Sequence, residues 1–324
     1  MSWMLRRSAP RPPRGLIFCF CLLAQLAWAQ GAAALGPFTH LVLARQLAEP
    51  AWANQPAVMA ALYAGALAPD AGYYPGAQEE LAQAAHLVRP WDMAHALLEL
   101  AATDEERAFA RGYLSHALLD RLGHESLINR LSGRPFSQDP LNHKRVEWGL
   151  DCWLLGQPQY QWLWEMGADS PAGLDLWARA WQRAHGVRVP PALLAQAMAA
   201  ELAEVHRLPR VFWLSGQAKR PGGWAGNGLG WLMDYSLRPA AVGFMAWRGG
   251  YMNERAVLSA RPAQAQDVAD LDALLDQVAR QTREAGQGAP LPGGNLDADP
   301  ACHEQACPEA RQALRWLEAL AKGS

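Results

Sequence analysis

Apolar residues recur at helical spacing along most of this 324-residue chain. Residues three and four apart lie on one face of an α-helix, so this repeat predicts helices that pack against one another. We find no convincing run that alternates apolar and polar residues, as a half-buried strand would. The sequence therefore predicts an all-α fold, either one multi-helix domain or a large and a small lobe. The predicted helices cover residues 40–48, 55–67, 78–86, 91–101, 104–131, 140–155, 172–185, 190–207, 264–285 and 304–321.

Segments rich in Gly, Pro, Asn or Asp separate the predicted helices. We expect loops at residues 69–76, 133–140, 219–230 and 286–301. The glycine-rich stretch 222–230 matches no phosphate-binding pattern, and we interpret it as a flexible loop.

The helix predicted over residues 104–131 carries a stripe of polar side chains. A capping box at Thr103 marks its start, and apolar residues follow at helical period. His116, Asp120 and His124 stand four residues apart, so all three should project from one face.

A second helix repeats this arrangement. Asp139 and Pro140 supply an N-cap and a first helical position, and His143 and Glu147 then stand one turn apart. Imidazole and carboxylate groups at this interval can converge on one zinc ion, although manganese or iron accept the same ligands. A single such pair is more often a surface ion pair. Two linked stripes beside an apolar face favour a cation, because unpaired buried charge is costly.

The N-terminus has the pattern of a signal peptide. Four arginines precede an apolar run from Gly15 to Ala27, and small residues follow it. Cleavage is expected after residue 29, giving a mature chain of residues 30–324, or after residue 34. A retained anchor and a gene start placed too early are the alternatives. The first reading predicts a secreted or periplasmic protein.

Charge and cysteine content limit the classes of function. Loss of residues 1–29 would change the formal charge from −2 to −6, which gives no support for a stable nucleic-acid partner. Cys302 and Cys307 are spaced to form a disulfide, as an exported chain permits, and Cys152 is expected to be a buried free thiol.

Residues 35–150 resemble the zinc-dependent phospholipase C family. That family includes clostridial alpha-toxin and is related to single-strand-specific zinc nucleases of fungi. The role of residues 157–324 stays open. The segments that carry the resemblance are Gly36-Pro37-Phe38-Thr39-His40, Gly65-Ala66-Leu67-Ala68-Pro69-Asp70, Gly112-Tyr113-Leu114-Ser115-His116 through Asp120 to His124, and His143 to Glu147.

The resemblance implies up to three zinc ions, with Asp120 bridging two of them. His95 competes with His86 as a ligand of the first ion. The third ion would need the backbone of Leu35 as the mature N-terminus, where the family commonly has tryptophan. The implied ligands are Asp70, His86, His116 and Asp120 for the first ion, His124, His143 and Glu147 for the second, and His40, Asp120 and Leu35 for the third.

The resemblance also implies hydrolysis of a phosphodiester, with phospholipid as the favoured substrate and transient contact with a membrane surface. Zinc lowers the pKa of bound water to about 7, and Asp70 would orient or deprotonate that water. Tyr73 and Tyr74 are candidates for substrate contact, with packing roles equally open. Asp151 is a candidate to brace His143 or Glu147, unless it is an exposed acid. A single-strand nuclease or 3′-nucleotidase and a non-catalytic zinc-binding protein remain alternatives.

Overall fold

The computed structural model describes residues 35–74, 76–166, 173–214, 217–218, 256 and 259–323, and these form helices joined by loops. Eleven α-helices and no β-strand occur within those ranges, which confirms the all-α prediction. The helices are α2 (Pro37–Gln46), α3 (Pro56–Leu67), α4 (Glu79–Leu87), α5 (Pro90–Leu100), α6 (Asp104–Gly123), α7 (Asn129–Ser132), α8 (Pro140–Leu155), α9 (Leu174–His185), α10 (Pro191–Leu214), α14 (Ala265–Gly286) and α15 (Pro308–Gly323).

Two segments that carry candidate ligands differ from the helices and loops predicted, and α10 extends beyond residue 207 to Leu214. The helix expected over residues 104–131 is interrupted, because α6 ends at Gly123 and a π-helical turn covers His124–Ile128 before α7. The loop expected at 69–76 begins as a 3₁₀ helix, Ala68–Tyr73. The predicted signal peptide, both cleavage sites and the loop at 219–230 lie outside the described residues.

Helices α3 and α6 cross with their backbones in close approach. A Cβ atom on Gly65 would lie 2.0 Å from the Phe109 carbonyl oxygen, and one on Gly112 would lie 2.1 Å from that of Leu62. Only glycine permits this spacing, because any side chain would separate the helices. The crossing places the 3₁₀ segment after α3 next to α6.

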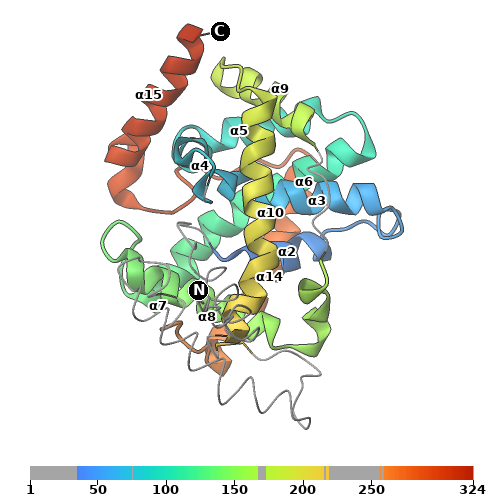
Figure 1. Cartoon of the computed structure of the whole chain (residues 1–324), viewed down its shortest axis with the longest axis vertical. Helices are drawn as coiled ribbons and strands as arrows, with labels where there is room; N and C mark the ends of the chain where they lie inside the picture. Colours follow the sequence, from blue (N-terminus) through green and yellow to red (C-terminus); the bar gives the residue numbers. More distant parts are fainter. Residues whose placement is uncertain are drawn as a thin grey trace, which may run out of the picture.

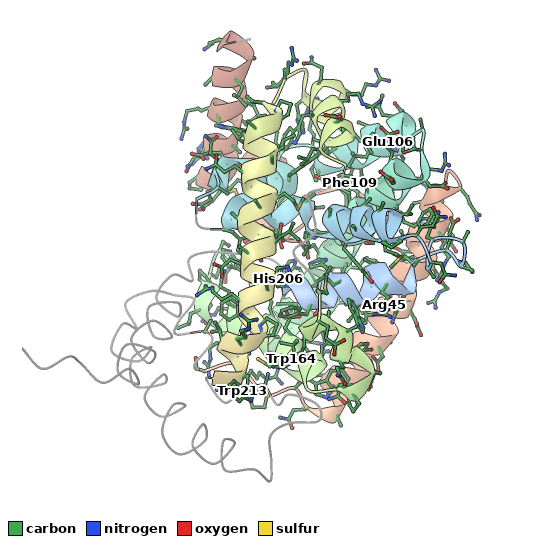
Figure 2. All side chains as sticks on the ribbon, turned by 45° about the vertical axis from the view of Figure 1, so that its right-hand side comes forward. Arg45, Glu106, Phe109, Trp164, His206 and Trp213 are labelled. Atoms are coloured by element: carbon green, nitrogen blue, oxygen red, sulfur yellow. A yellow bond between two sulfur atoms is a disulfide. The ribbon has the colours of Figure 1, made fainter. Side chains whose placement is uncertain are left out.

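Aromatic side chains link the surrounding helices to this pair. Phe109 on α6 lies inside the packed helices, with its ring centroid 6.2 Å from that of Trp177 on α9 (Figure 2). Phe212 on α10 contacts Phe38 on α2 and Trp148 on α8, at centroid distances of 6.4 and 5.5 Å. Helix α10 runs along the long axis of the molecule in front of the others (Figure 1). In the described part of the chain, each helix is too short or too polar to cross a membrane.

Candidate metal centre

Eight side chains predicted as metal ligands come together in the interior, and each is at most 2% exposed. They form two groups in which the potential ligand atoms lie within 4.8 Å of one another, and His40 adjoins the first group. The first group consists of Asp70, His86, His116 and Asp120, and the second of His124, His143 and Glu147.

The distances in the first group suit a shared cation. His86 Nε2 lies 3.2 Å from both Asp70 Oδ1 and Asp120 Oδ2. His116 Nε2 lies 3.1 Å from Asp120 Oδ2 and 3.8 Å from Asp70 Oδ1. Two ligands of one tetrahedral zinc ion, each about 2.1 Å from it, are about 3.4 Å apart. The four side chains therefore surround a space of the right size for one ion.

Backbone hydrogen bonds fix which ring nitrogen of two histidines faces this space. The Nδ1–H of His116 donates to the Ala66 carbonyl at 2.7 Å, and that of His86 donates to the Ala82 carbonyl at 2.9 Å. In the neutral rings, Nε2 then carries a lone pair directed at carboxylate oxygens. That contact is repulsive unless a proton or a metal ion lies between, and ligating histidines are commonly oriented in this way.

Protonation of the centre reflects these contacts. Burial lowers the pKa of His86, but its hydrogen bond to Asp120 and the nearby charge of Asp70 outweigh burial and hold that pKa well above its ordinary value. Burial also lowers the pKa of His124, and its hydrogen bond to Glu147 raises it to about 9. The metal-free site therefore holds protons on His86 and His124 at neutral pH, and a divalent cation would displace them.

The π-helical turn belongs to the second group. His124 Nε2 and His143 Nε2 lie 3.3 and 3.1 Å from Glu147 Oε1. His143 and Glu147 stand one turn apart on α8, as predicted, whereas His124 begins the π turn after α6. Asp120 and His124 belong to different groups, as the family resemblance implied, although the straight helix expected to carry both contains the π turn. An inserted π turn often marks a functional site.

Asp151 positions the helix that carries His40. Its carboxylate accepts hydrogen bonds from Phe38 N, Thr39 N and Thr39 Oγ1 at 3.2, 3.0 and 2.8 Å. The sequence made Asp151 a candidate to brace His143 or Glu147, or else an exposed acid. Asp151 is instead fully buried, and its hydrogen bonds go to the start of α2. A Cβ atom on Gly36 would lie 2.1 Å from Asp151 Oδ2, so this contact needs glycine.

The structure also bears on Leu35 as the predicted N-terminal residue and on the choice between His86 and His95 as a ligand. Leu35 is fully buried, and its Cδ1 atom would lie 2.5 Å from a Cβ atom on Gly123, the residue before His124. His95 is exposed on α5, whereas His86 is in the first group.

Unpartnered polar atoms show that the site fits a metal. Buried nitrogen and oxygen atoms without a hydrogen-bond partner are rare in proteins. Although His40 Nε2 lies 3.1 Å from Asp120 Oδ1, neither atom has a hydrogen-bond partner in the described structure. Their lone pairs therefore face a common space, as the ligands of an ion do. The other such atoms in the two groups include Asp70 Oδ1, His116 Nε2, His143 Nε2 and Glu147 Oε2.

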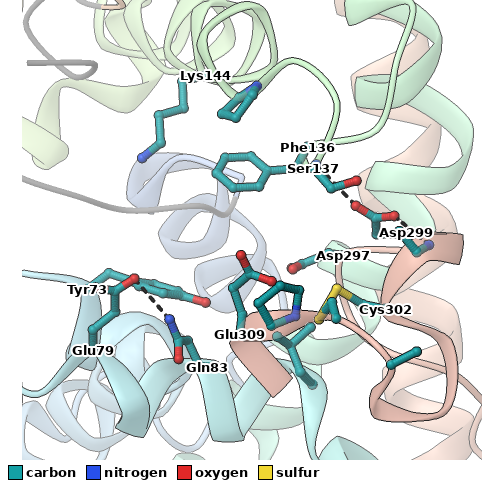
Figure 3. Close-up of a pocket in the computed structure, with 16 residues that line it drawn as sticks. Tyr73, Glu79, Gln83, Phe136, Ser137, Lys144, Asp297, Asp299, Cys302 and Glu309 are labelled. Carbon is teal, nitrogen blue, oxygen red and sulfur yellow. Dashed lines mark hydrogen bonds between the residues drawn. A yellow bond between two sulfur atoms is a disulfide. The ribbon is translucent and has the colours of Figure 1, made fainter. Parts of the chain in front are cut away.

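A pocket of about 520 Å³ (Figure 3) is lined by neighbours of the two groups, among them Tyr73, Phe136 and Asp297, although none of the candidate ligands of the two groups lines it. Tyr73 lines it, with its ring centroid 5.5 Å from that of His86, whereas Tyr74 is buried elsewhere. Lys144 also lines the pocket. Its amine is buried without a hydrogen-bond partner among the described residues, and burial lowers its pKa to about 8. The pocket therefore combines an aromatic wall with one buried cation.

The sequence interpretation missed two residues of this region. Lys144 lies between His143 and Glu147 but was given no role, and its position beside a ligand was the available signal. Asp297 comes from the loop before Cys302, where no helical spacing marks it. Cys302 and Cys307 form a disulfide beside the pocket, and Cys152 is a buried free thiol.

Comparison with known proteins gives one match. Residues 39–186 match the family model described as zinc dependent phospholipase C. This segment contains the seven side chains of the two groups and also His40. No curated protein and no solved structure matches the chain. Leu35 and Asp297 lie outside the matched segment.

Proposed function

We propose that this chain, which over residues 39–186 belongs to the zinc-dependent phospholipase C family of phosphodiesterases, cleaves phospholipids to diacylglycerol and a phosphorylated headgroup. The observation that carries the proposal is a cluster of buried imidazoles and carboxylates beside a pocket with an aromatic wall.

The residues suited to hold zinc are the two groups described above. Asp120 would serve two ions, since its Oδ2 faces His86 and His116 while its Oδ1 faces His40. Bound zinc supplies a water of lowered pKa and neutralises charge on phosphate oxygens.

Three side chains of the chain itself would act on the substrate. Asp70 has an oxygen without a hydrogen-bond partner and would orient the attacking water. Lys144 would contact a phosphate oxygen, because a buried ammonium without a partner gains most from an anionic ligand. Tyr73 would pack against the headgroup or glycerol portion, as its place on the pocket wall allows.

Charge around the pocket favours a phospholipid over a nucleic acid. Among its described lining residues, Lys144 is the only cation and faces four acids, Glu79, Asp297, Asp299 and Glu309. Such a wall repels a chain of phosphates, whereas nucleic-acid sites usually carry a basic groove. A single phosphodiester at the ions, with contact to a lipid surface, avoids this repulsion.

Export is part of the proposal. We infer that a leader ending at residue 29 or 34 is removed, and that a start at Leu35 would place a free backbone amine near the cluster. The buried side chain of Leu35 beside Gly123 supports this. The intact mass of the exported protein tests it, and a fully active protein that begins at Gln30 would contradict the start at Leu35.

The test compares hydrolysis of p-nitrophenylphosphorylcholine and of single-stranded DNA, each with and without a chelator. We expect chelator-sensitive hydrolysis of the first substrate. His86→Ala should abolish it, and His95→Ala, which removes an exposed imidazole from α5, should not. Hydrolysis of DNA alone would support the nuclease. Full zinc binding without either activity would support a non-catalytic protein.

A further inference from the structure

Asp297 brings a further carboxylate to the junction of the two ligand groups. Its potential ligand atom lies within 4.8 Å of those of Asp120 and His124, which belong to different groups. Its Oδ1 atom is buried and has no hydrogen-bond partner in the described structure. Figure 3 shows Asp297 and Lys144 on different sides of the pocket.

The loop that carries Asp297 is held by the helices that carry the ligands. The Leu296 N–H donates to the carbonyl of His86 at 3.1 Å. Trp91 Nε1 on α5 donates to the Gly294 carbonyl at 2.8 Å, and Arg121 Nε on α6 donates to that of Gly293 at 3.2 Å. The backbone before Asp297 is therefore fixed directly against α4, α5 and α6.

The turn around Asp297 is closed by its own side chains. The Asn295 side-chain amide donates to the Asp299 carbonyl, and Asn295 Oδ1 accepts from Asp299 N, both at 3.0 Å. Ala298, directly after Asp297, has a φ of 49°, in the left-handed region that residues other than glycine rarely adopt. Such strain persists where the surroundings enforce it, commonly at functional sites.

We propose that Asp297 is a metal ligand that completes the second group and joins it to the first. The inference rests on the proposed zinc chemistry of the site. The second group offers three side chains to an ion that takes at least four ligands, one of which can be water, and the Asp297 carboxylate lies next to His124.

The charges in the site agree with this assignment. The two groups contain three carboxylates, those of Asp70, Asp120 and Glu147, which carry fewer negative charges than the proposed divalent ions would carry positive ones. Asp297 supplies the fourth negative charge. Asp297 is half-buried, but its Oδ1 atom is buried, and a buried carboxylate oxygen without a hydrogen-bond partner is costly on its own and becomes favourable beside a cation.

Direct measurement of metal binding tests this inference without reference to activity. Asp297→Asn keeps the size of the side chain and the backbone contacts of the loop. We expect zinc affinity, measured by competition with a chromophoric chelator, to fall on the order of 10–100-fold at one ion. The visible spectrum of the cobalt-loaded protein, which reports the ligand set, should also change. Asp92→Asn, an exposed acid on α5, is the matched control.

Two results would overturn the assignment. One is wild-type zinc affinity in Asp297→Asn. The other is weaker zinc binding together with an unaltered cobalt spectrum and a lower melting temperature of the metal-free protein. That combination would indicate a loosened loop. Asp297→Ala serves as a second variant if the first does not fold. Wild-type protein that hydrolyses no phosphodiester would contradict the proposed function, whereas the zinc measurements would still decide the role of Asp297.

Discussion

Asp120 contacts more candidate ligands than any other side chain of the described centre. Its oxygens lie between 3.1 and 3.2 Å from ring nitrogens of His40, His86 and His116. The two imidazoles of His116 and His40 hold the pKa of Asp120 well below its ordinary value, although burial alone would raise it. The residue is therefore a carboxylate at neutral pH, and two of the proposed ions depend on it.

Asp120→Asn removes this charge without changing the size of the side chain. We expect zinc content to fall and phosphodiester hydrolysis to drop on the order of 100-fold or more, since even loss of a residue that only orients a ligand costs about 10–100-fold. Elemental analysis and initial rates measure the two effects, with Asp92→Asn as control. Retention of all zinc at the normal rate would refute the role given to Asp120.

Substitution of Lys144 should lower the catalytic activity without lowering the stability of the fold. Lys144→Met keeps the aliphatic stem and removes a buried charge that has no hydrogen-bond partner in the described structure. We expect kcat/KM to fall about 10–100-fold, because a hydrogen bond to a charged group contributes about 1.5–3 kcal/mol. The melting temperature should hold or rise. Lys322→Met, at an exposed position of α15, is the control. An unchanged kcat/KM in Lys144→Met would exclude contact between Lys144 and the phosphate.

The candidate ligands differ in how far the sequence alone could identify them. His116, Asp120, His143 and Glu147 could be predicted because helical spacing alone places each pair on one face. Spacing could not decide between His86 and His95, since which face of α4 or α5 points inward depends on the packing of other helices. Asp297 left no local signal, because its position is set by hydrogen bonds to helices distant in sequence.

At the scale of elements, the predicted and observed helices agree closely because apolar periodicity reflects burial directly. The π turn at His124–Ile128 was not predictable in this way. The spacing of Asp120 and His124 is that of a straight helix, and it was the family resemblance, not the spacing, that assigned them to different ions; the structure places them in separate groups.

The crossing of α3 and α6 is the element-scale feature on which the site depends most. Gly112→Ala would place a methyl group 2.1 Å from the Leu62 carbonyl oxygen, so the helices must separate. We expect unfolding free energy to fall by about 1–3 kcal/mol. Zinc affinity should also fall, because His116 is oriented by the carbonyl of Ala66 on α3.

Gly286→Ala is the matched control for this crossing. Gly286 ends α14, and a Cβ atom there would have no neighbour within 4 Å. Chemical denaturation and chelator competition should therefore give wild-type values for this variant. Equal values for both alanine variants would show that the crossing tolerates a side chain and does not position His116.

At the scale of the whole molecule, residues beyond the family segment complete the surroundings of the site. The pocket takes residues from the 3₁₀ helix Ala68–Tyr73, from α4 and from α8, and also from the loop before α15 and from α15 itself. The resemblance covered only residues 35–150, and the role of 157–324 could not be predicted. Long-range packing, which no local pattern encodes, brings the C-terminal loop to α4, α5 and α6.

The pH dependence of the unfolding free energy tests the packing of His185, a residue outside the proposed metal centre. His185, at the end of α9, lies 4.8 Å from Trp181 between ring centroids, and its Nδ1 lies 3.3 Å from the guanidinium of Arg89. Burial, aided by the charge of Arg89, lowers the pKa of His185 from 6.5 to about 4. The fold therefore favours the neutral ring, and the unfolded chain binds the proton more readily.

His185 should make the folded protein less stable as the solution becomes acidic. Because its folded pKa lies below its unfolded pKa, the stability it contributes is complete above pH 6.5 and is lost as pH falls from 6.5 towards 4. In His185→Gln this loss should disappear. The difference in unfolding free energy between wild type and variant should therefore change across that window. With allowance for solvent screening, we expect a change on the order of 1 kcal/mol. Release of zinc by acid affects both proteins alike and cancels in the difference, since distant sites contribute independently. Denaturant titrations at pH 7, 5.5 and 4 measure it, and parallel stability curves for the two proteins would show that His185 is not held neutral by the fold.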